Sequence, residues 1–237
     1  MKAVSQLDRD TFIKEIFAAV AHDIDFLSTF FSFGLDRGWR RRLVSLLDLR
    51  GGERILDVCA GTGELALLLA RKVGRNGAVW GVDFSSEMLG VARTKLNGNG
   101  ANINLALSDA KHLDFPDNSF DAVTVAFGMR NISDTAAALR EACRVLRPGG
   151  RFCCLELTLP TAQWVKPLYA VYCFRIMPFI AAKVLKTAAP YNYLPRSIHA
   201  FAPPGEFRRM LETCGFTDVN VHSMTFGVAT IYSARKD

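Results

Sequence analysis

The sequence predicts an α/β protein with a mostly parallel, seven-stranded sheet, helices on both faces and a C-terminal hairpin that adds an antiparallel strand. Between Arg54 and Glu156, short apolar runs alternate with helical patterns at the spacing of strand–helix units. A glycine-rich turn joins the first run to the first helical pattern, and two alternating patterns close the chain. Half of the 237 residues are apolar, so the chain can bury a large core.

Each apolar run is short enough for a buried strand, and each helical pattern has a recognisable end. The expected strands are Ile55–Val58, Ala78–Asp83, Ile103–Leu107, Asp121–Phe127 and Arg151–Leu157, then Thr217–Ser223 and Val228–Tyr232 as the hairpin. The expected helices are Glu64–Val73, Ser86–Asn97, Asp134–Leu146 and Glu206–Cys214. Their end signals are Ser85 or Ser86 as a cap, the breaker Pro148-Gly149-Gly150, and Gly215.

Two flanking segments depart from this alternation. Residues 11–48 show only helical spacing, for example at Phe12, Ile16 and Val20. Residues 161–200 form a long insertion before the sheet resumes. We therefore expect one domain, residues 1–237, with four parts: an N-terminal helical segment (1–50), a ligand-binding core (51–160), a helical cap or lid (161–200), and a C-terminal helix with the hairpin (201–237).

The net charge of +6 is concentrated at the carboxyl end, where residues 160–237 contain nine Lys or Arg and four Asp or Glu. Such a basic and apolar surface fits an anionic membrane face better than a nucleic-acid groove, although the charges could simply solvate a surface. The N-terminal residues lack the pattern of a secretory signal, and no run of about 18 uncharged apolar residues occurs. We expect a cytoplasmic protein with a peripheral contact at the inner membrane face and no nucleic-acid partner.

The cysteines and histidines do not predict a metal site or a disulfide framework. The six cysteines include no C-x-x-C pair, and adjacent Cys153 and Cys154 should face opposite sides of a strand. The four histidines have no ligand spacing. We expect no metal and a reducing compartment.

The glycine-rich turn is flanked by carboxylates, which favours a cationic ligand. Asp57 lies in the first strand, Gly61 and Gly63 form the turn, and Glu64 begins the helix. This pattern also fits a nicotinamide dinucleotide, but two carboxylates would repel its pyrophosphate. S-adenosylmethionine has an ammonium, a sulfonium and no phosphate, so acidic groups suit it. Asp83, at the end of the second strand, can bind ribose hydroxyls in either cofactor, and Asp109 can accept from an adenine amine or cap a turn.

Several ordered motifs now resemble a known family. Asp57-x-x-x-Gly61-Thr62-Gly63, Gly81-Val-Asp83-Phe84-Ser, Asp109-Ala110 and Leu146-Arg-Pro-Gly-Gly150 resemble class I S-adenosylmethionine-dependent methyltransferases with a Rossmann-like fold. The more specific segments Phe127-Gly-Met-Arg130-Asn131 and Tyr191-Asn-Tyr193-Leu194 are similar to the ubiquinone/menaquinone biosynthesis C-methyltransferases. The likeness extends over residues 12–235. Ile24 and Ser28 stand where that family usually has Tyr and Asn.

The resemblance implies S-adenosylmethionine as cofactor and a polyprenyl quinol, or a similar small phenol, as acceptor. The expected cofactor residues are Asp57, Gly61, Thr62, Gly63, Asp83, Phe84, Asp109, Ala110 and Ala126. Arg130 and Asn131 match a polar pair on the acceptor side, and Tyr191 and Tyr193 are expected to contact the acceptor or to pack.

Ring methylation requires an electron-rich carbon, which a quinol supplies and an electrophilic quinone does not. Arg130 is too basic to act as a simple base, but it can stabilise a developing phenolate. It could instead form an ion pair in a loop, for instance with Asp134. Other readings are a different phenolic or lipid acceptor, a nicotinamide oxidoreductase, and a non-catalytic adenosylmethionine-binding partner.

The insertion between Trp164 and Ala189 is the expected lid. At 100° per residue, Arg175, Lys183 and Lys186 form a basic stripe beside apolar residues, although Pro178 could kink the helix. This surface could lie on a bilayer and admit a polyprenyl tail, or it could pack on the sheet or on a second copy in a homodimer.

Overall fold

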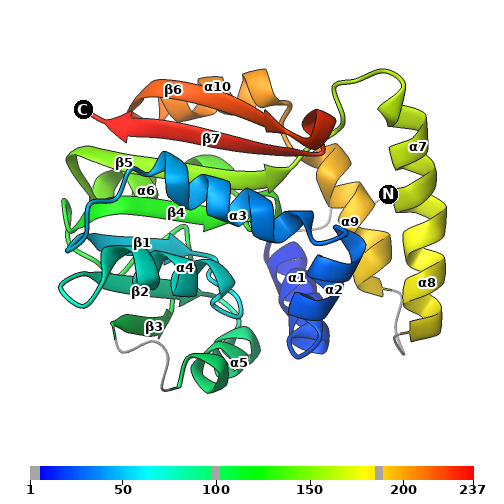
Figure 1. Cartoon of the computed structure of the whole chain (residues 1–237), viewed down its shortest axis with the longest axis horizontal. Coiled ribbons are helices and arrows are strands. Elements are labelled where there is room, and N and C mark those ends of the chain that lie inside the picture. The colour runs from blue at the N-terminus through cyan, green and yellow to red at the C-terminus, as the bar shows by residue number, and fades with distance from the viewer. Residues whose placement is uncertain (1–5, 98–101, 185–188) are drawn as a thin grey trace.

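The computed structural model of the chain describes residues 6–97, 102–184 and 189–237, and it contains one seven-stranded sheet (Figure 1). The strand order is β3-β2-β1-β4-β5-β7-β6. All pairings from β3 through β5 are parallel, whereas β7 runs antiparallel to both β5 and β6. The predicted architecture is therefore confirmed. The strands are β1 (Arg54–Val58), β2 (Ala78–Asp83), β3 (Ile103–Leu107), β4 (Phe120–Ala126), β5 (Leu146–Leu157), β6 (Phe216–Met224) and β7 (Ala229–Lys236).

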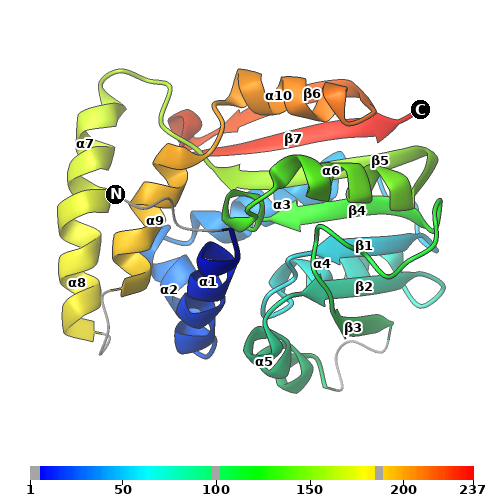
Figure 2. The same ribbon diagram turned by 180° about the vertical axis from the view of Figure 1, so that it is seen from behind.

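Helices cover both faces of the sheet, as the short alternating units require. One face packs against α3 (Leu35–Leu46) and α4 (Glu64–Val73), and the other packs against α6 (Thr135–Val145) and α10 (Pro204–Thr213) (Figures 1 and 2). Alternation along a strand separates the two cores: Cys153 belongs to the first core and Cys154 to the second.

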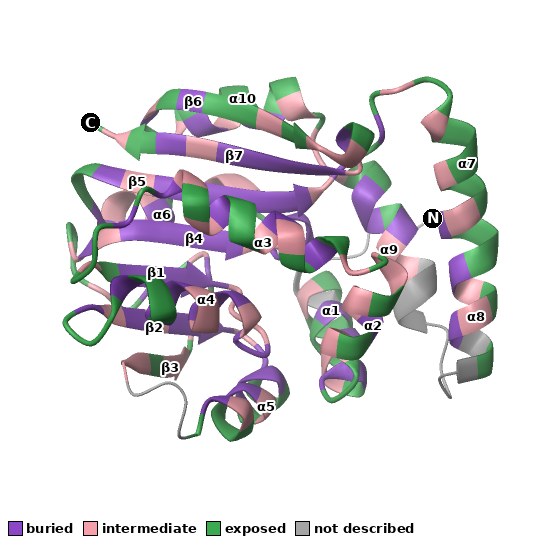
Figure 3. Cartoon of the chain, in the orientation of Figure 1, coloured by how far each residue is buried: buried purple, intermediate pink, exposed green. Residues whose placement is uncertain are grey.

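Figure 3 shows that burial is concentrated in the central strands. The remaining long helices lie beyond the carboxyl ends of the parallel strands or beside β2 and β3. They are α1 (Gln6–Val20), α2 (Ile24–Phe31), α5 (Ser86–Leu96), α7 (Val165–Val171), α8 (Met177–Val184) and α9 (Ala189–Ala200). Thus the N-terminal helices and the cap lie at the end of the sheet where ligands bind in such folds.

The junction between α6 and β5 differs from the prediction. The helix ends at Val145 rather than Leu146, and the strand begins at Leu146 rather than Arg151. Phe120 pairs with Leu146 and Ala122 with Arg151, so the Pro-Gly-Gly segment forms an irregularity inside the strand. Gly149, with φ of 72°, provides the left-handed backbone that this bulge needs.

The cap helix also differs from the regular helix that underlies the predicted basic stripe. A π-helical turn, Tyr172–Ile176, separates α7 from α8, and Pro178 follows it. Proline cannot donate the regular backbone hydrogen bond, which accounts for the wider turn. The uniform 100° step assumed for Arg175 and Lys183 therefore does not apply through the π turn, and both residues are exposed. Lys186 lies outside the described residues.

Among the described residues, no helix combines the length and apolarity that crossing a bilayer requires. The same ranges bring no three His, Cys, Asp or Glu side chains together as candidate metal ligands.

Candidate functional site

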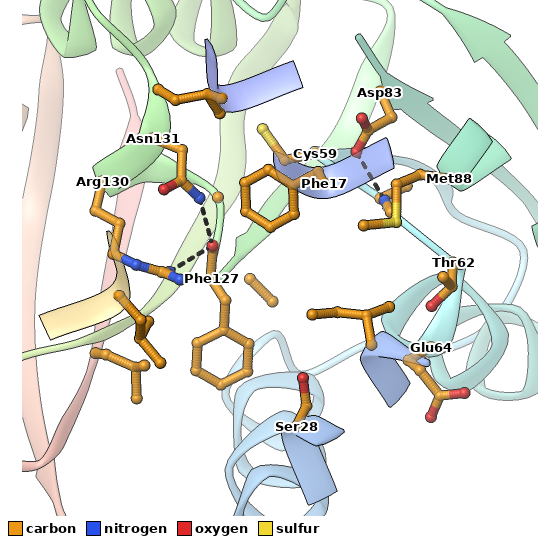
Figure 4. A pocket seen from close by; sticks show the side chains of 18 of the residues that line it. Phe17, Ser28, Cys59, Thr62, Glu64, Asp83, Met88, Phe127, Arg130 and Asn131 are labelled. Carbon is orange, nitrogen blue, oxygen red and sulfur yellow. Dashed lines mark hydrogen bonds between the residues drawn. The ribbon is translucent and has the colours of Figure 1, made fainter. Parts of the chain in front are cut away.

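A cavity of about 340 Å³ lies at the carboxyl ends of β1, β2 and β4. Its walls come from the glycine-rich turn, α1, α2, the turn after β4, and the cap (Figure 4). This is the edge of the sheet at which the strand order reverses, so the backbone leaves a crevice there.

The glycine-rich turn is fixed by Asp83. The Gly61 N–H donates to Oδ2 of Asp83 over 2.8 Å, and the Ser85 N–H donates to Oδ1 over 2.9 Å. Gly61 and Gly63 have φ of 55° and 82°, which explains why the turn requires glycine. Burial raises the pKa of Asp83, while these backbone donors oppose the rise. Each carboxylate oxygen keeps a second lone pair for a ligand hydroxyl.

Asp57 is a buried carboxyl with one unsatisfied oxygen. The Thr124 hydroxyl donates to Oδ1 over 2.8 Å, and Oδ2 has no hydrogen-bond partner among the residues that the structure describes. Burial raises the pKa of Asp57 to about 7. Because Asp57 lines the cavity, a cationic ligand there would favour the ionised form of its carboxyl through its charge.

Helix α2 is joined to the glycine-rich turn through Asp25 and Lys95, for which the sequence predicted no role. The Thr62 hydroxyl donates to Asp25 over 2.5 Å, and Lys95 of α5 forms an ion pair with Asp25. Lys95 also pairs with Glu64 over 2.8 Å. One cation thus partly neutralises two carboxylates at the cavity and fastens α2 over it.

Helix α1 is fastened on the opposite side of the cavity. Lys111 pairs with Asp10 over 2.6 Å, and the Ser133 hydroxyl donates to the same carboxylate over 3.1 Å. Asp109 accepts the Lys111 N–H and is exposed, whereas Ala110 is buried. Asp109 therefore stabilises the turn after β3 and also lines the cavity.

The turn after β4 presents Arg130 and Asn131 to the cavity. Phe127 has φ of 60°, and its carbonyl accepts from Arg130 Nη1 over 2.5 Å and from Asn131 Nδ2 over 3.3 Å (Figure 4). A Cβ at Gly128 would lie 2.4 Å from Cβ of Cys59, so only glycine permits this contact with the glycine-rich turn.

Arg130 is paired with Glu156, and not with the loop residue Asp134 that we considered. Nη1 of Arg130 donates to Oε1 of Glu156 over 2.6 Å, and both side chains are buried. Asp134 instead caps α6 by accepting the Ala137 N–H. The charge on Arg130 is therefore compensated inside the protein.

The cap contributes Tyr193 and Ser197 from α9. The Tyr193 hydroxyl donates to Oδ1 of Asn131 over 3.0 Å, and Nε of Arg130 donates to the Ser197 hydroxyl over 3.3 Å. Burial raises the pKa of Tyr193, so its hydroxyl is a donor at neutral pH. Tyr191 lies in the same helix, and its side chain lies outside what the structure describes.

Most of the predicted residues meet at this cavity. Those that line it are Asp57, Gly61, Thr62, Asp83, Phe84, Asp109, Ala110, Ala126, Arg130, Asn131 and Tyr193. Gly63 does not line it; it is the N-cap of α4, and a Cβ there would meet Leu96 of α5. The contacts around the cavity also involve residues for which the sequence predicted no role: Asp10, Asp25, Lys95, Lys111, Glu156 and Ser197. Their partners are distant in sequence, so no local pattern marks them. Ile24 and Ser28 also line the cavity.

Comparison with known sequences gives matches over nearly the whole chain. Residues 4–236 match the model of the ubiE/COQ5 methyltransferase family. The protein named ubiquinone/menaquinone biosynthesis C-methyltransferase UbiE from Geobacter sulfurreducens is 39% identical over 226 residues, covering 94% of this chain and 88% of that protein. The protein of the same name from Xanthomonas campestris is 37% identical, covering 98% and 93%.

Solved structures match the fold at low sequence identity. A SAM-dependent methyltransferase from Aquifex aeolicus has a TM-score of 0.61 at 20% identity, covering 84% of this chain and 89% of that chain. The Haemonchus contortus phosphoethanolamine N-methyltransferase 2, solved in complex with S-adenosyl-L-methionine, has a TM-score of 0.62 at 18% identity, covering 84% and 52%.

Proposed function

Because the chain belongs to the ubiE/COQ5 methyltransferase family, we propose that it methylates a ring carbon of a polyprenyl quinol in ubiquinone or menaquinone biosynthesis. It is an S-adenosylmethionine-dependent methyltransferase. The observation that carries the proposal is one cavity in which an acidic turn suited to a cationic cofactor faces the Arg130–Asn131 pair. The acceptor is a demethylmenaquinol or a benzoquinol, and the four parts of residues 1–237 act as one catalytic domain.

The cofactor fits the acidic half of the cavity. Its ammonium would lie on the side of Asp57, whose carboxyl favours a nearby cation, and its ribose hydroxyls would donate to Asp83. Asp109 would accept from the adenine amine, beside buried Ala110 and with Phe84 and Ala126 in the wall. Gly61 and Thr62 would border the methionine part. When bound, S-adenosylmethionine supplies an electrophilic methyl group on sulfur.

Residues on the opposite wall would activate the acceptor. The quinol carbon becomes nucleophilic as the neighbouring hydroxyl loses its proton. Arg130 would stabilise the negative charge on that oxygen, and Asn131 would orient the hydroxyl or a water that accepts its proton. Tyr193 holds Asn131 in place through Oδ1. The surrounding apolar residues would exclude bulk water and strengthen these interactions.

Replacement of Arg130 tests this function. Arg130→Ala should lower single-turnover methylation of a short-chain quinol by about a hundredfold or more, the scale of losing one oxyanion donor. Cofactor affinity, measured by calorimetry, should barely change. Arg130→Lys should recover little, because a planar fork is replaced by a point charge. Arg147→Ala, which breaks an exposed ion pair with Asp121, is the matched control and should keep the parent rate.

Two results would contradict the proposal. The first is a folded Arg130→Ala enzyme that methylates at the parent rate. The second is a deletion strain whose quinones, analysed by mass spectrometry, carry the same methyl groups as those of the parent strain. Methylation of another phenol or lipid, but not of quinols, would establish the alternative acceptor class, and binding of cofactor without any methyl transfer would establish a non-catalytic partner.

We also propose that the cap contacts a bilayer surface. The α7–α8 segment exposes Trp164 (64%), Leu168 (64%) and Phe179 (61%) beside Lys166, Arg175 and Lys183. Aromatic and aliphatic bulk flanked by cations suits the interface of an anionic membrane. This surface lies next to Tyr172, which lines the cavity and donates to the Phe31 carbonyl of α2 over 2.7 Å. An isoprenoid tail could pass from the cavity to the bilayer at this contact between α2 and the cap.

Vesicle binding tests the membrane proposal. The protein should sediment with anionic vesicles more than with neutral ones, and Phe179→Ser with Arg175→Ser should weaken sedimentation while leaving cofactor binding unchanged. Equal, negligible sedimentation with both vesicle types would contradict it. If light scattering instead shows a dimer that these substitutions dissociate, the same face is the interface of a homodimer.

A further inference from the structure

Glu156 is a fully buried carboxylate behind the acceptor side of the cavity. It is the second-last residue of β5, at the carboxyl end of the strand, and its exposed fraction is 0%. It does not line the cavity. An isolated buried carboxylate costs several kcal/mol of desolvation, so its contacts indicate what it does.

Glu156 holds Arg130 at two points. Oε1 accepts from Nη1 of Arg130 over 2.6 Å and from the Leu157 N–H over 2.8 Å. Oε2 accepts from the backbone N–H of Arg130 over 3.1 Å. One carboxylate therefore fixes both the backbone and the guanidinium of the same residue, which restricts the side chain to one orientation.

The remaining contacts of Arg130 leave one edge of the guanidinium available. Nη1 also donates to the Phe127 carbonyl over 2.5 Å, and Nε donates to Ser197 over 3.3 Å. Within the described ranges, no protein acceptor is recorded for the two N–H groups of Nη2. Since Arg130 lines the cavity, that edge is the part that can donate to an acceptor oxygen.

The pair also balances charge. The family cofactor carries a sulfonium, and an uncompensated guanidinium in the same cavity would repel it. Glu156 cancels that charge at 2.6 Å but leaves the N–H dipoles of Nη2 in place. A hydrophobic pair of similar size would often be no less stable than a buried ion pair, so stability alone does not explain this one.

We propose that Glu156 is a positioning residue for methyl transfer: together with Ser197, it holds Arg130 so that Nη2 meets the acceptor oxygen. The proposal rests on the function proposed above. It goes further in assigning a role to a residue that touches neither cofactor nor acceptor and acts only through Arg130.

Four variants test it by single-turnover methylation and calorimetry. Glu156→Gln keeps the size but loses the charge and one acceptor, and Glu156→Asp keeps the charge but is too short for both contacts. Each should lower kcat about tenfold or more, with the KM of the acceptor and the Kd of the cofactor within about threefold. The other two variants are Arg130→Ala and the double variant Glu156→Gln/Arg130→Ala. If Glu156 acts through Arg130, the double variant should be no slower than Arg130→Ala alone.

Glu53→Gln is the matched control. Glu53 also accepts backbone N–H groups, from Arg50 and Gly51, and faces an arginine, Arg151, but it precedes β1 at the other end of the sheet. It should keep the parent kcat even if it lowers the melting temperature. If both Glu156 variants fail to fold, Ser197→Ala keeps the ion pair and removes the Nε contact, together with the hydrogen bond that the Ser197 hydroxyl donates to the Leu194 carbonyl in its own helix. It should lower kcat severalfold in the parent and not at all in Arg130→Ala.

The outcomes separate the inference from the function on which it rests. A folded Glu156→Gln enzyme with the parent kcat, or a double variant in which the two losses multiply, would overturn the positioning role while Arg130→Ala stays slow. If Arg130→Ala itself retains the parent rate, the proposed role of Arg130 fails first, and the positioning role fails with it.

Discussion

Asp57 shows how one unsatisfied atom can couple ligand binding to protonation. With a pKa of about 7, about nine-tenths of Asp57 is protonated at pH 6 in the free protein. A bound ammonium would lower that pKa, because a nearby cation favours the ionised form. Binding should therefore release a proton, and cofactor affinity should rise between pH 5 and pH 7.

Calorimetry at pH 6 in buffers of different ionisation enthalpy would measure this release. Asp57→Asn should abolish it and flatten the pH dependence. Proton uptake on binding, or release that persists in Asp57→Asn, would contradict the assignment.

Asp83 carries the second prediction at this scale. Asp83→Asn should weaken S-adenosylmethionine binding by about 1.5 to 3 kcal/mol, because charge-assisted hydrogen bonds to the ribose are lost. Part of this loss would come from the turn, since Asp83 accepts the Gly61 N–H. Asp114→Asn, outside the cavity, is the control for a general charge effect. An unchanged dissociation constant by calorimetry would place Asp83 outside the binding site.

Residues at strand ends were predictable, whereas their partners were not. Asp57, Asp83 and Arg130 follow or end apolar runs, and parallel strands bring such positions to one edge. The partner of Arg130 depends on the pairing of β4 with β5, which places Glu156 next to a residue 26 positions earlier. Asp134 lies only four residues after Arg130, so the sequence alone made it a suitable ion-pair partner for that arginine.

At the scale of elements, α2 is a cover fastened through Asp25 to the glycine-rich turn, where we propose that the cofactor binds. Asp25→Asn should weaken the contacts with Thr62 and Lys95 and leave Glu64 with Lys95 alone. We expect weaker cofactor binding, by about 1 to 2 kcal/mol, and faster amide exchange across Ile24–Phe31.

Hydrogen exchange and calorimetry on the same samples would measure both effects. Asp23→Asn is the control, because Asp23 is exposed, precedes the same helix and makes no side-chain capping bond. If both variants behave alike, the contact at Asp25 does not fasten the cover.

Element types were predicted better than element ends or irregular turns. Periodicity located the strands within a few residues, because buried strands need apolar runs. Apolar spacing did not predict the π turn at Tyr172–Ile176, because Pro178 signals an interruption of the helix but not the form that it takes. The left-handed backbone at Phe127 was equally hidden, because its carbonyl is held there by Arg130 and Asn131.

For the whole molecule, the cavity joins the sheet to the N-terminal helices and the cap, so a ligand there should stabilise all three. S-adenosylmethionine at a hundred times its Kd should contribute about 2.7 kcal/mol, which raises the melting temperature by about 5 to 11 °C for a chain of this size. NAD and NADP at equal concentrations should give no rise in differential scanning fluorimetry. Stabilisation by NAD, without any by S-adenosylmethionine, would contradict the charge argument made for Asp57 and Glu64.

The π turn in the cap has a consequence for chain length. A π turn holds about one residue more than an α-helical turn, so deleting one residue between Tyr172 and Ile176 would close the turn into regular α-helix and leave α8 near its present orientation relative to α7. Met177 and Ala181 would then keep their packing with Leu27 and Leu194, and Phe179 would stay on the exposed side. The cap can thus lose a residue at this turn without exchanging its inner and outer faces.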